Sequence, residues 1–177
     1  CVQHTPGVDA SSGSLGQGIS VAVGMALSAK LSNEDYRVYT LLGDGEIQEG
    51  QVWEASMFAA AKKLDNLCVI VDNNGLQIDG PVDVVNSPYP IPEKFESFGF
   101  HVVRVADGND FDQLRAAFAE ARATKGVPTA IVMKTVKGKG ISYMENQVGW
   151  HGKAPNDEEY AIAVKELEEA EEALCQK

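Results

Sequence analysis

Four continuous apolar runs alternate with stretches of helical pattern along this chain, and this alternation limits the folds open to it. The apolar runs lie at residues 37–42, 66–72, 100–105 and 128–135. The helical patterns lie at residues 14–31, 51–64, 91–99, 110–124 and 157–174. A strand that is apolar on both faces must be covered on both faces. The order of elements therefore predicts an α/β fold, a parallel β-sheet sandwiched by helices.

Details of several elements can also be predicted. The helix at 51–64 has an apolar line that should face the core, formed by Trp53, Met57, Ala60 and Leu64. Asp110 is the expected N-cap of the helix that follows it. Residues 80–92 hold four of the seven prolines and should form a long surface loop. At 177 residues, with a loop-like start and no initiator Met, we expect one domain over residues 1–177 that lacks an N-terminal part.

Composition excludes several classes of partner. The formal net charge is -11, which argues against nucleic acid or an anionic membrane surface. No apolar run approaches the ~20 residues that cross a bilayer, and no signal peptide is visible. The three cysteines, Cys1, Cys68 and Cys175, are far apart and form no CxxC pair. This usage predicts a reducing, cytoplasmic location, with Cys68 as a buried core residue.

A carboxylate stands between two glycines directly after the run at 37–42, as Gly43-Asp44-Gly45. Asn74 follows the next run, 30 residues further on (74 − 44 = 30). In an open parallel sheet, ligands bind at the carboxyl ends of the strands, so both side chains should stand at one edge. Their oxygens suit Mg²⁺, which completes its shell with phosphate and water. Gly-Asp-Gly alone is more typical of a plain turn, but its pairing with Asn74 favours a metal and phosphate site.

Residues 43–80, "GDGEIQEGQVWEASMFAAAKKLDNLCVIVDNNGLQIDG", resemble the thiamine diphosphate fingerprint. More narrowly, the chain resembles transketolase in its diphosphate-binding (PP) domain. The stretches "TPGVDASSGSLGQGISVAVGMA", "IDGPVD" and "GWHGKAP" agree with this, and the resemblance runs from residue 6 to about residue 155. The short length and the end soon after "WHGKAP" resemble the N-terminal subunit of a split transketolase, whose second half is a separate chain.

The resemblance implies a cofactor site made of named residues. Asp44 and Asn74 would give side-chain ligands to Mg²⁺, for which Ca²⁺ or Mn²⁺ can substitute, and Leu76 would give its backbone carbonyl. The implied residues for thiamine diphosphate are Gly13, Ser14, Leu15, Gly45, Asn74, Ile78 and His151. From composition alone, Leu76 and Ile78 would be interpreted as plain core residues.

Two residues are implied to serve catalysis. His151 matches a histidine that reaches the diphosphate and the sugar substrate, in a loop where we expect partial burial. Glu49 matches an acidic residue at the subunit interface that links paired active sites. Without the resemblance, His151 would be interpreted as a surface histidine. Glu49 could instead be a charge that favours a helix N-terminus.

The function that the resemblance implies is that of a transketolase subunit in the pentose phosphate pathway. Such an enzyme moves a two-carbon ketol unit from a ketose phosphate to an aldose phosphate. The family's histidines upstream of "PGV" and its pyrimidine-binding domain are missing from this sequence. Activity should therefore require a C-terminal transketolase subunit, and we expect a heterotetramer.

Two other functions stay open at this point. The alpha subunit of a 2-oxo acid dehydrogenase E1 shares the Gly-Asp-Gly pattern, although "GWHGKAP" and "PGVDASSGSLGQG" disfavour it. A non-catalytic module that binds the cofactor or only pairs with a partner is the third possibility.

Overall fold

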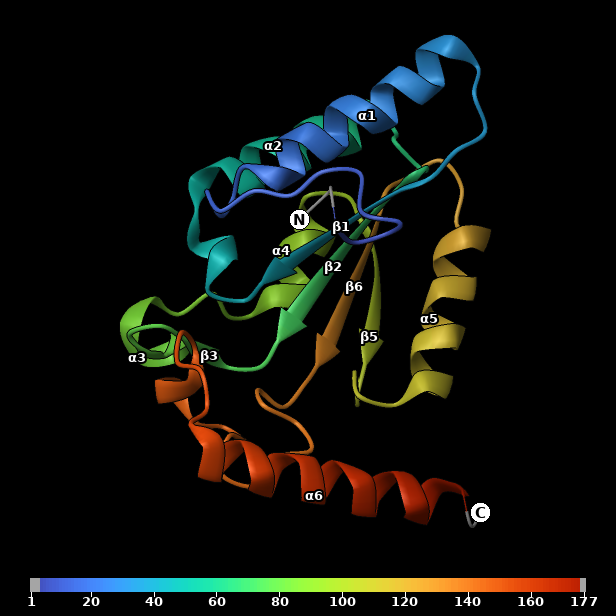
Figure 1. Ribbon diagram of the computed structural model, residues 1–177. Helices are drawn as coiled ribbons and strands as arrows, with labels where there is room; N and C mark the ends of the chain where they lie inside the picture. Colours follow the sequence, from blue (N-terminus) through green and yellow to red (C-terminus); the bar gives the residue numbers. More distant parts are fainter. Residues whose placement is uncertain (1–3, 176–177) are drawn as a thin grey trace.

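A four-stranded parallel sheet forms the centre of the computed structural model, which describes residues 4–175 (Figure 1). Its order is β1 (Val38–Gly43), β2 (Leu67–Asn73), β6 (Thr129–Lys134) and β5 (His101–Val105). All three strand pairs are parallel, as the apolar runs predicted. Two short strands, β3 (Leu76–Gln77) and β4 (Gly80–Pro81), form a separate antiparallel ladder after β2.

Helices cover both faces of the sheet, which confirms the predicted sandwich. The helices are α1 (Gly18–Ser32), α2 (Gly50–Ala61), α3 (Val82–Asn86), α4 (Ile91–Ser97), α5 (Phe111–Ala123) and α6 (Asp157–Cys175). Short 3₁₀ helices lie at η1 (Glu46–Gln48) and η2 (Val148–Trp150). The larger core cluster joins α1, α2 and α4 to one face of the sheet, and the smaller one joins α5 to the other. Figure 1 shows α6 across the side toward which the strands point.

The core face of α2 differs from the predicted one. Val52, Ser56 and Ala59 are fully buried, whereas Met57 is 61% exposed. The expectation for Met57 was wrong because α2 packs closely against α1, where small side chains fit better than large ones. Ser56 can be buried there because its hydroxyl donates to the Val52 carbonyl at 2.7 Å.

Other parts of the expected line do contribute to the core. Trp53 is half-buried, and its ring packs on Phe95 and Phe98 at centroid distances of 5.1 and 5.3 Å. Its indole N–H donates to the Ile47 carbonyl at 2.9 Å. Leu64 is fully buried, just beyond the end of α2.

Two element boundaries also differ from expectation. α1 begins at Gly18 rather than at residue 14, because Gly16 has a φ of +84°, which no helix accommodates. Residues 80–92 are not loop throughout, since they contain α3, whose Val82 is buried. The predicted cap of α5 is confirmed, because the Asp110 carboxylate accepts from the N–H groups of Asp112 and Gln113 at 2.8 and 3.1 Å.

The cysteines and the question of membrane spans can be addressed for most of the chain. Cys68 is fully buried, as expected, and burial raises the pKa of its thiol to about 12. Cys175 is exposed, and Cys1 lies outside the described residues. Within residues 4–175, no helix has both the length and the apolar composition that a membrane crossing requires.

The corrected face of α2 can be tested with a matched pair of substitutions. Val52→Ala should lower the free energy of unfolding by about 1–3 kcal/mol, because it removes buried methyl groups and leaves a cavity. Met57→Ala should change it by no more than about 0.5 kcal/mol, because the side chain is mostly exposed. Urea unfolding of both variants at one temperature measures this. A larger loss in Met57→Ala than in Val52→Ala would contradict the packing described above.

Candidate functional site

The register between β1 and β2 brings the two predicted motifs together. Gly43 is paired with Asp72, and the Asp44 N–H donates to the Asp72 carbonyl at 3.1 Å. β1 ends at Gly43 and β2 ends at Asn73, one residue after Asp72, so both segments leave the sheet at its carboxyl edge. Asp44 and Asn74 therefore lie at the same edge of the sheet, as the sequence predicted.

The carboxylate of Asp44 joins these two loops. It is only 1% exposed, and its two oxygens accept from different backbone groups. Oδ1 accepts from Gly45 N–H at 2.9 Å, and Oδ2 accepts from Gly75 N–H at 2.5 Å. Burial raises the pKa of Asp44 above its ordinary value, although both N–H donors act in the opposite direction and nearby Asp72 adds to the rise. A buried carboxylate in this condition favours a neighbouring cation.

Hydrogen bonds fix the orientation of the Asn74 amide. Its Oδ1 accepts from Leu76 N–H at 3.0 Å, and its Nδ2 donates to Asp72 Oδ1 at 3.3 Å. The Thr135 hydroxyl, from the loop after β6, also donates to Asp72 Oδ1. The amide oxygen therefore lies on the Leu76 side, and Asp72 holds the amide nitrogen away from it.

The donor atoms at this edge fit Mg²⁺. Asp44 offers a carboxylate, Asn74 an amide oxygen and Leu76 a backbone carbonyl, which are all hard oxygen ligands. Across residues 4–175, no group of three or more His, Cys, Asp or Glu side chains could hold a metal ion. A metal here would therefore rest on one carboxylate with neutral oxygens beside it. That combination leaves positions for phosphate and water, as Mg²⁺ prefers.

Glycines at the site are required by close contacts. A Cβ on Gly45 would come within 2.9 Å of the Gln77 Cβ. A Cβ on Gly16 would come within 2.8 Å of the Glu49 Cβ. The absence of side chains at these two positions lets the loop after β1 approach both the β3 loop and the turn before α1.

The predicted residues Gly13, Ser14 and Leu15 form an exposed turn before α1. Ser14 and Leu15 line a groove of about 910 Å³ between residues 7–18, the outer side of α1 and the edge strand β1. The Glu46 carboxylate accepts from Gly16 N–H at 2.8 Å and from Gly43 N–H at 3.0 Å. The turn is thereby brought beside the Gly43-Asp44-Gly45 loop.

The remaining predicted residues occupy different environments. Leu76 is half-buried, but Ile78 is 64% exposed, so the interpretation of Ile78 as a core residue was wrong. Glu49 is the N-cap residue of α2, and its side chain makes no capping hydrogen bond.

His151 follows η2 and is exposed, so the expected partial burial was also wrong. Its neighbour Trp150 anchors this loop by donating to the Tyr143 carbonyl at 3.0 Å and by lying under the Lys153 ammonium, 4.1 Å from the ring centroid.

Sequence reasoning missed the residues that support the site. Asp72 and Glu46 act on the backbone or side chains of other segments, as described above. Gln48 Nε2 donates to Gln77 Oε1 at 2.6 Å and to the Asn86 carbonyl at 2.7 Å. The position of Asp72 in "DNNG" was the one available signal, because it lies two residues before the predicted ligand.

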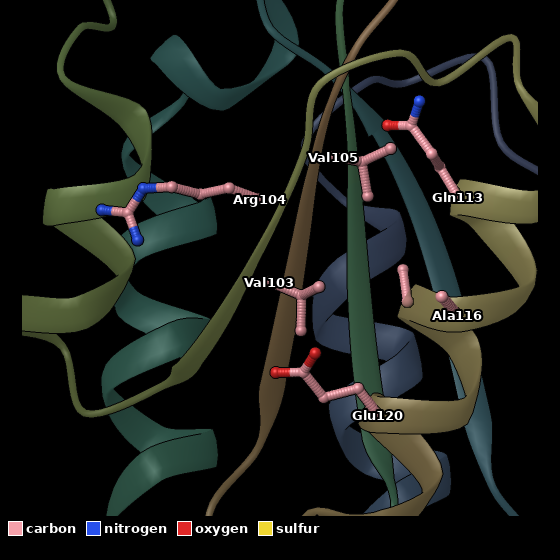
Figure 2. A pocket seen from close by; sticks show the side chains of 7 residues that line it. Val103, Arg104, Val105, Gln113, Ala116 and Glu120 are labelled. Atoms are coloured by element: carbon pink, nitrogen blue, oxygen red, sulfur yellow. The ribbon is translucent and has the colours of Figure 1, made fainter.

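A second, smaller cleft lies beside β5, which is the outer strand of the sheet on the side opposite β1 (Figure 2). It measures about 210 Å³ between β5 and α5, with Val103, Val105 and Ala116 along it and Glu120 at its rim. Arg104 points away from this cleft and pairs with Glu93 and Glu96. None of the predicted site residues lines it.

Comparison with known proteins agrees with the geometry. The family described as "Transketolase, thiamine diphosphate binding domain" matches residues 1–171. The chain is 41% identical over 167 residues to a 6-deoxy-6-sulfo-D-fructose transketolase subunit of Clostridium sp. (strain MSTE9), covering 94% of this chain and 60% of that subunit. It is 40% identical over 171 residues to an apulose-4-phosphate transketolase subunit of Phocaeicola vulgatus, covering 97% of this chain and 60% of that one.

Among solved structures, the transketolase of Campylobacter jejuni superposes with a TM-score of 0.84 at 33% identity, covering 90% of this chain and 26% of that enzyme. The chain thus spans 60% of the length of the two curated subunits. With the family match over nearly all its residues, the chain belongs to the transketolase family, in the thiamine diphosphate-binding domain.

Proposed function

We propose that this chain is one subunit of a transketolase that transfers a two-carbon ketol unit from a ketose phosphate to an aldose phosphate. The observation that carries the proposal is the set of oxygen donors at the carboxyl edge of the sheet. Asp44 and Asn74 are brought together there by the β1–β2 register and by the Gly75–Asp44 hydrogen bond. When bound, thiamine diphosphate would supply a carbanion that attacks the donor carbonyl.

The residues of this chain would bind and orient that cofactor. Asp44, Asn74 and the Leu76 carbonyl would hold Mg²⁺, whose charge would offset the cost of ionising the buried Asp44. Gly45 N–H, which donates to Asp44 Oδ1 in the structure, would donate to the diphosphate when the cofactor is bound. The exposed turn at Gly13, Ser14 and Leu15 would lie against the cofactor, and Ile78 would contact its rings. The exposed side chain of Ile78 supports this role, because burial of such a side chain by a ligand is favourable.

His151 would contact the diphosphate and the sugar substrate. Its exposure leaves the imidazole free to hydrogen-bond a phosphate or hydroxyl, while Trp150 keeps its loop in place. The sulfo-sugar and apulose-4-phosphate names of the relatives support a phosphorylated or similarly anionic sugar as substrate. Glu49, at the start of α2, would link the paired active sites.

A partner chain would complete the enzyme. The relatives are named as subunits, and α1 and α2, which pack against each other, expose apolar side chains that a partner would cover: Val21, Met25, Met57 and Phe58. We propose that a C-terminal transketolase subunit is this partner, with a heterotetramer as the assembly. We further propose a cytoplasmic location and a place in the pentose phosphate pathway. The unpaired Cys68 and Cys175 support the location.

The two alternatives are less well supported. An E1 alpha subunit is not favoured, because the relatives at about 40% identity are transketolase subunits. A non-catalytic module would bind cofactor without ever gaining activity from a partner. The second of the two experiments below, which measures product with and without a partner chain, separates that case from an enzyme subunit.

Asp44→Ala should weaken the binding of Mg²⁺–thiamine diphosphate by at least about 100-fold, because it removes the one charged ligand. The fold should persist, since the raised pKa of Asp44 means that its ionised form is disfavoured by burial. Isothermal titration calorimetry with a thermal melt measures both effects. Asp112→Ala, on exposed α5 surface, is the control. Equal affinity in Asp44→Ala and wild type would remove the basis for the metal site.

The chain by itself, saturated with thiamine diphosphate and Mg²⁺, should form no product from a ketose phosphate and an aldose phosphate. The residues described here serve the diphosphate end, and the resemblance implies that the aminopyrimidine end needs a glutamate from the partner's domain. Product formation is followed with and without a candidate partner chain. Turnover well above a protein-free control, with no second chain detected by mass spectrometry, would disprove the split-subunit proposal.

A further inference from the structure

Glu46 makes two hydrogen bonds that bring separate segments of the chain together. Its Oε1 accepts from Gly16 N–H at 2.8 Å, and its Oε2 accepts from Gly43 N–H at 3.0 Å. Gly16 ends the turn before α1, and Gly43 ends β1. Glu46 itself begins η1 and is half-buried.

A carboxylate suits this position better than any other side chain. Two N–H donors converge on it, and only an ionised carboxylate offers two acceptor oxygens with no donor of its own. Hydrogen bonds to a charged acceptor are also the stronger kind. An amide would accept one of these bonds and would turn an NH₂ group toward the other N–H.

The turn before α1 has few other restraints. Its internal hydrogen bonds are local, from Ser14 N–H to Ser12 Oγ at 3.0 Å and from Gln17 N–H to the Ser14 carbonyl at 3.3 Å. In the part of the chain that the structure describes, the bond from Gly16 to Glu46 is the one hydrogen bond from residues 4–16 to a segment beyond α1. Van der Waals contact between Gly16 and Glu49 lies beside it.

Gln48, at the end of η1, links this 3₁₀ turn to the segments that follow β2. Gln48 contacts Gln77 in β3 and the Asn86 carbonyl at the end of α3. One 3₁₀ turn thus touches the turn at residues 13–16, the Gly43-Asp44-Gly45 loop and the loop after β2. Glu46 is the member of η1 that acts on the first two.

We propose that Glu46 is a positioning residue for the cofactor: its carboxylate holds the Gly13–Leu15 turn beside Gly45, so that both face the diphosphate together. This proposal rests on the proposed function. Glu46 lines the same groove as Ser14 and Leu15, but its two carboxylate oxygens accept from the backbone N–H groups of Gly16 and Gly43. Its role is to supply the geometry in which the exposed turn is already in place before the ligand arrives.

Electrostatics alone predicts the opposite effect for this residue. A negative charge near an anionic diphosphate weakens its binding, so neutralising Glu46 should strengthen binding if charge were its main influence. If Glu46 positions the turn, neutralising it should weaken binding. The direction of the change therefore distinguishes the two roles.

The experiment compares Glu46→Gln and Glu46→Asp with wild type in calorimetric titrations with Mg²⁺–thiamine diphosphate, well below the melting temperature of each variant. Glu46→Gln should bind about 10-fold more weakly, because one charge-assisted bond is lost and two donors face each other. Glu46→Asp keeps the charge but is one methylene too short to reach both donors, so it should also bind more weakly. Glu120→Gln, on exposed α5, should bind like wild type.

Amide hydrogen exchange on the same variants gives a readout that does not need the cofactor. Faster exchange is expected at Gly16 and Gly43 in Glu46→Gln, with core strands unchanged. Unaltered or tighter cofactor binding in Glu46→Gln, or unaltered exchange at Gly16, would overturn the proposal.

Failure of this proposal and failure of the proposed function are distinguishable. Weaker binding in Asp44→Ala but not in Glu46→Gln would overturn the role of Glu46 alone. Absence of cofactor binding by wild type, or equal binding by wild type and Asp44→Ala, would contradict the proposed site and with it this inference.

Discussion

The site depends on the two hydrogen bonds that the Asp44 carboxylate accepts from the backbone. The carboxylate is buried, and it accepts one N–H from its own loop and one from the loop after β2. The Gln48–Gln77 hydrogen bond joins the same two loops further from the sheet, and the Asp44 bridge fixes their separation next to the strand ends. Burial, with the nearby charge of Asp72, raises the pKa of Asp44 although the two N–H donors lower it, so the bridge by itself leaves the negative charge of Asp44 poorly compensated. A divalent cation at this point would compensate that charge.

The sheet and its helices provide the conditions for that bridge. Parallel pairing in register sets Gly43 opposite Asp72, so the residues that follow are adjacent. Close packing of α1 on α2 through small side chains brings the turn before α1 within reach of η1. The same helices leave larger apolar side chains exposed on their outer surface, such as Met57. The chain therefore brings the loops after β1 and β2 together while apolar side chains stay exposed on α1 and α2.

The sequence correctly predicted the features that depend on hydrophobic periodicity and on where strands end. The strands, the α5 cap and the placement of Asp44 and Asn74 at one edge of the sheet follow from local pattern and from the geometry of parallel sheets. The core face of α2 was predicted wrongly. Where α2 packs against α1, small residues such as Ser56 and Ala59 are buried, and their composition alone does not indicate a core position. The links made by Glu46 and Asp72 were also missed, since they join side chains to segments that only the folded chain brings near. The extent of the domain over residues 1–177 and the roles of all the predicted site residues, including Asp44, Glu49 and His151, stay predictions.

The most direct test of the account is the position of a bound metal. Crystals of the chain grown with thiamine diphosphate and Mn²⁺, which substitutes for Mg²⁺, would locate the ion by its anomalous scattering. The account predicts one strong peak in contact with an Asp44 carboxylate oxygen, Asn74 Oδ1 and the Leu76 carbonyl, with diphosphate oxygens on its open side. A cofactor bound at this edge with no peak at those atoms, or a peak at other residues, would contradict it.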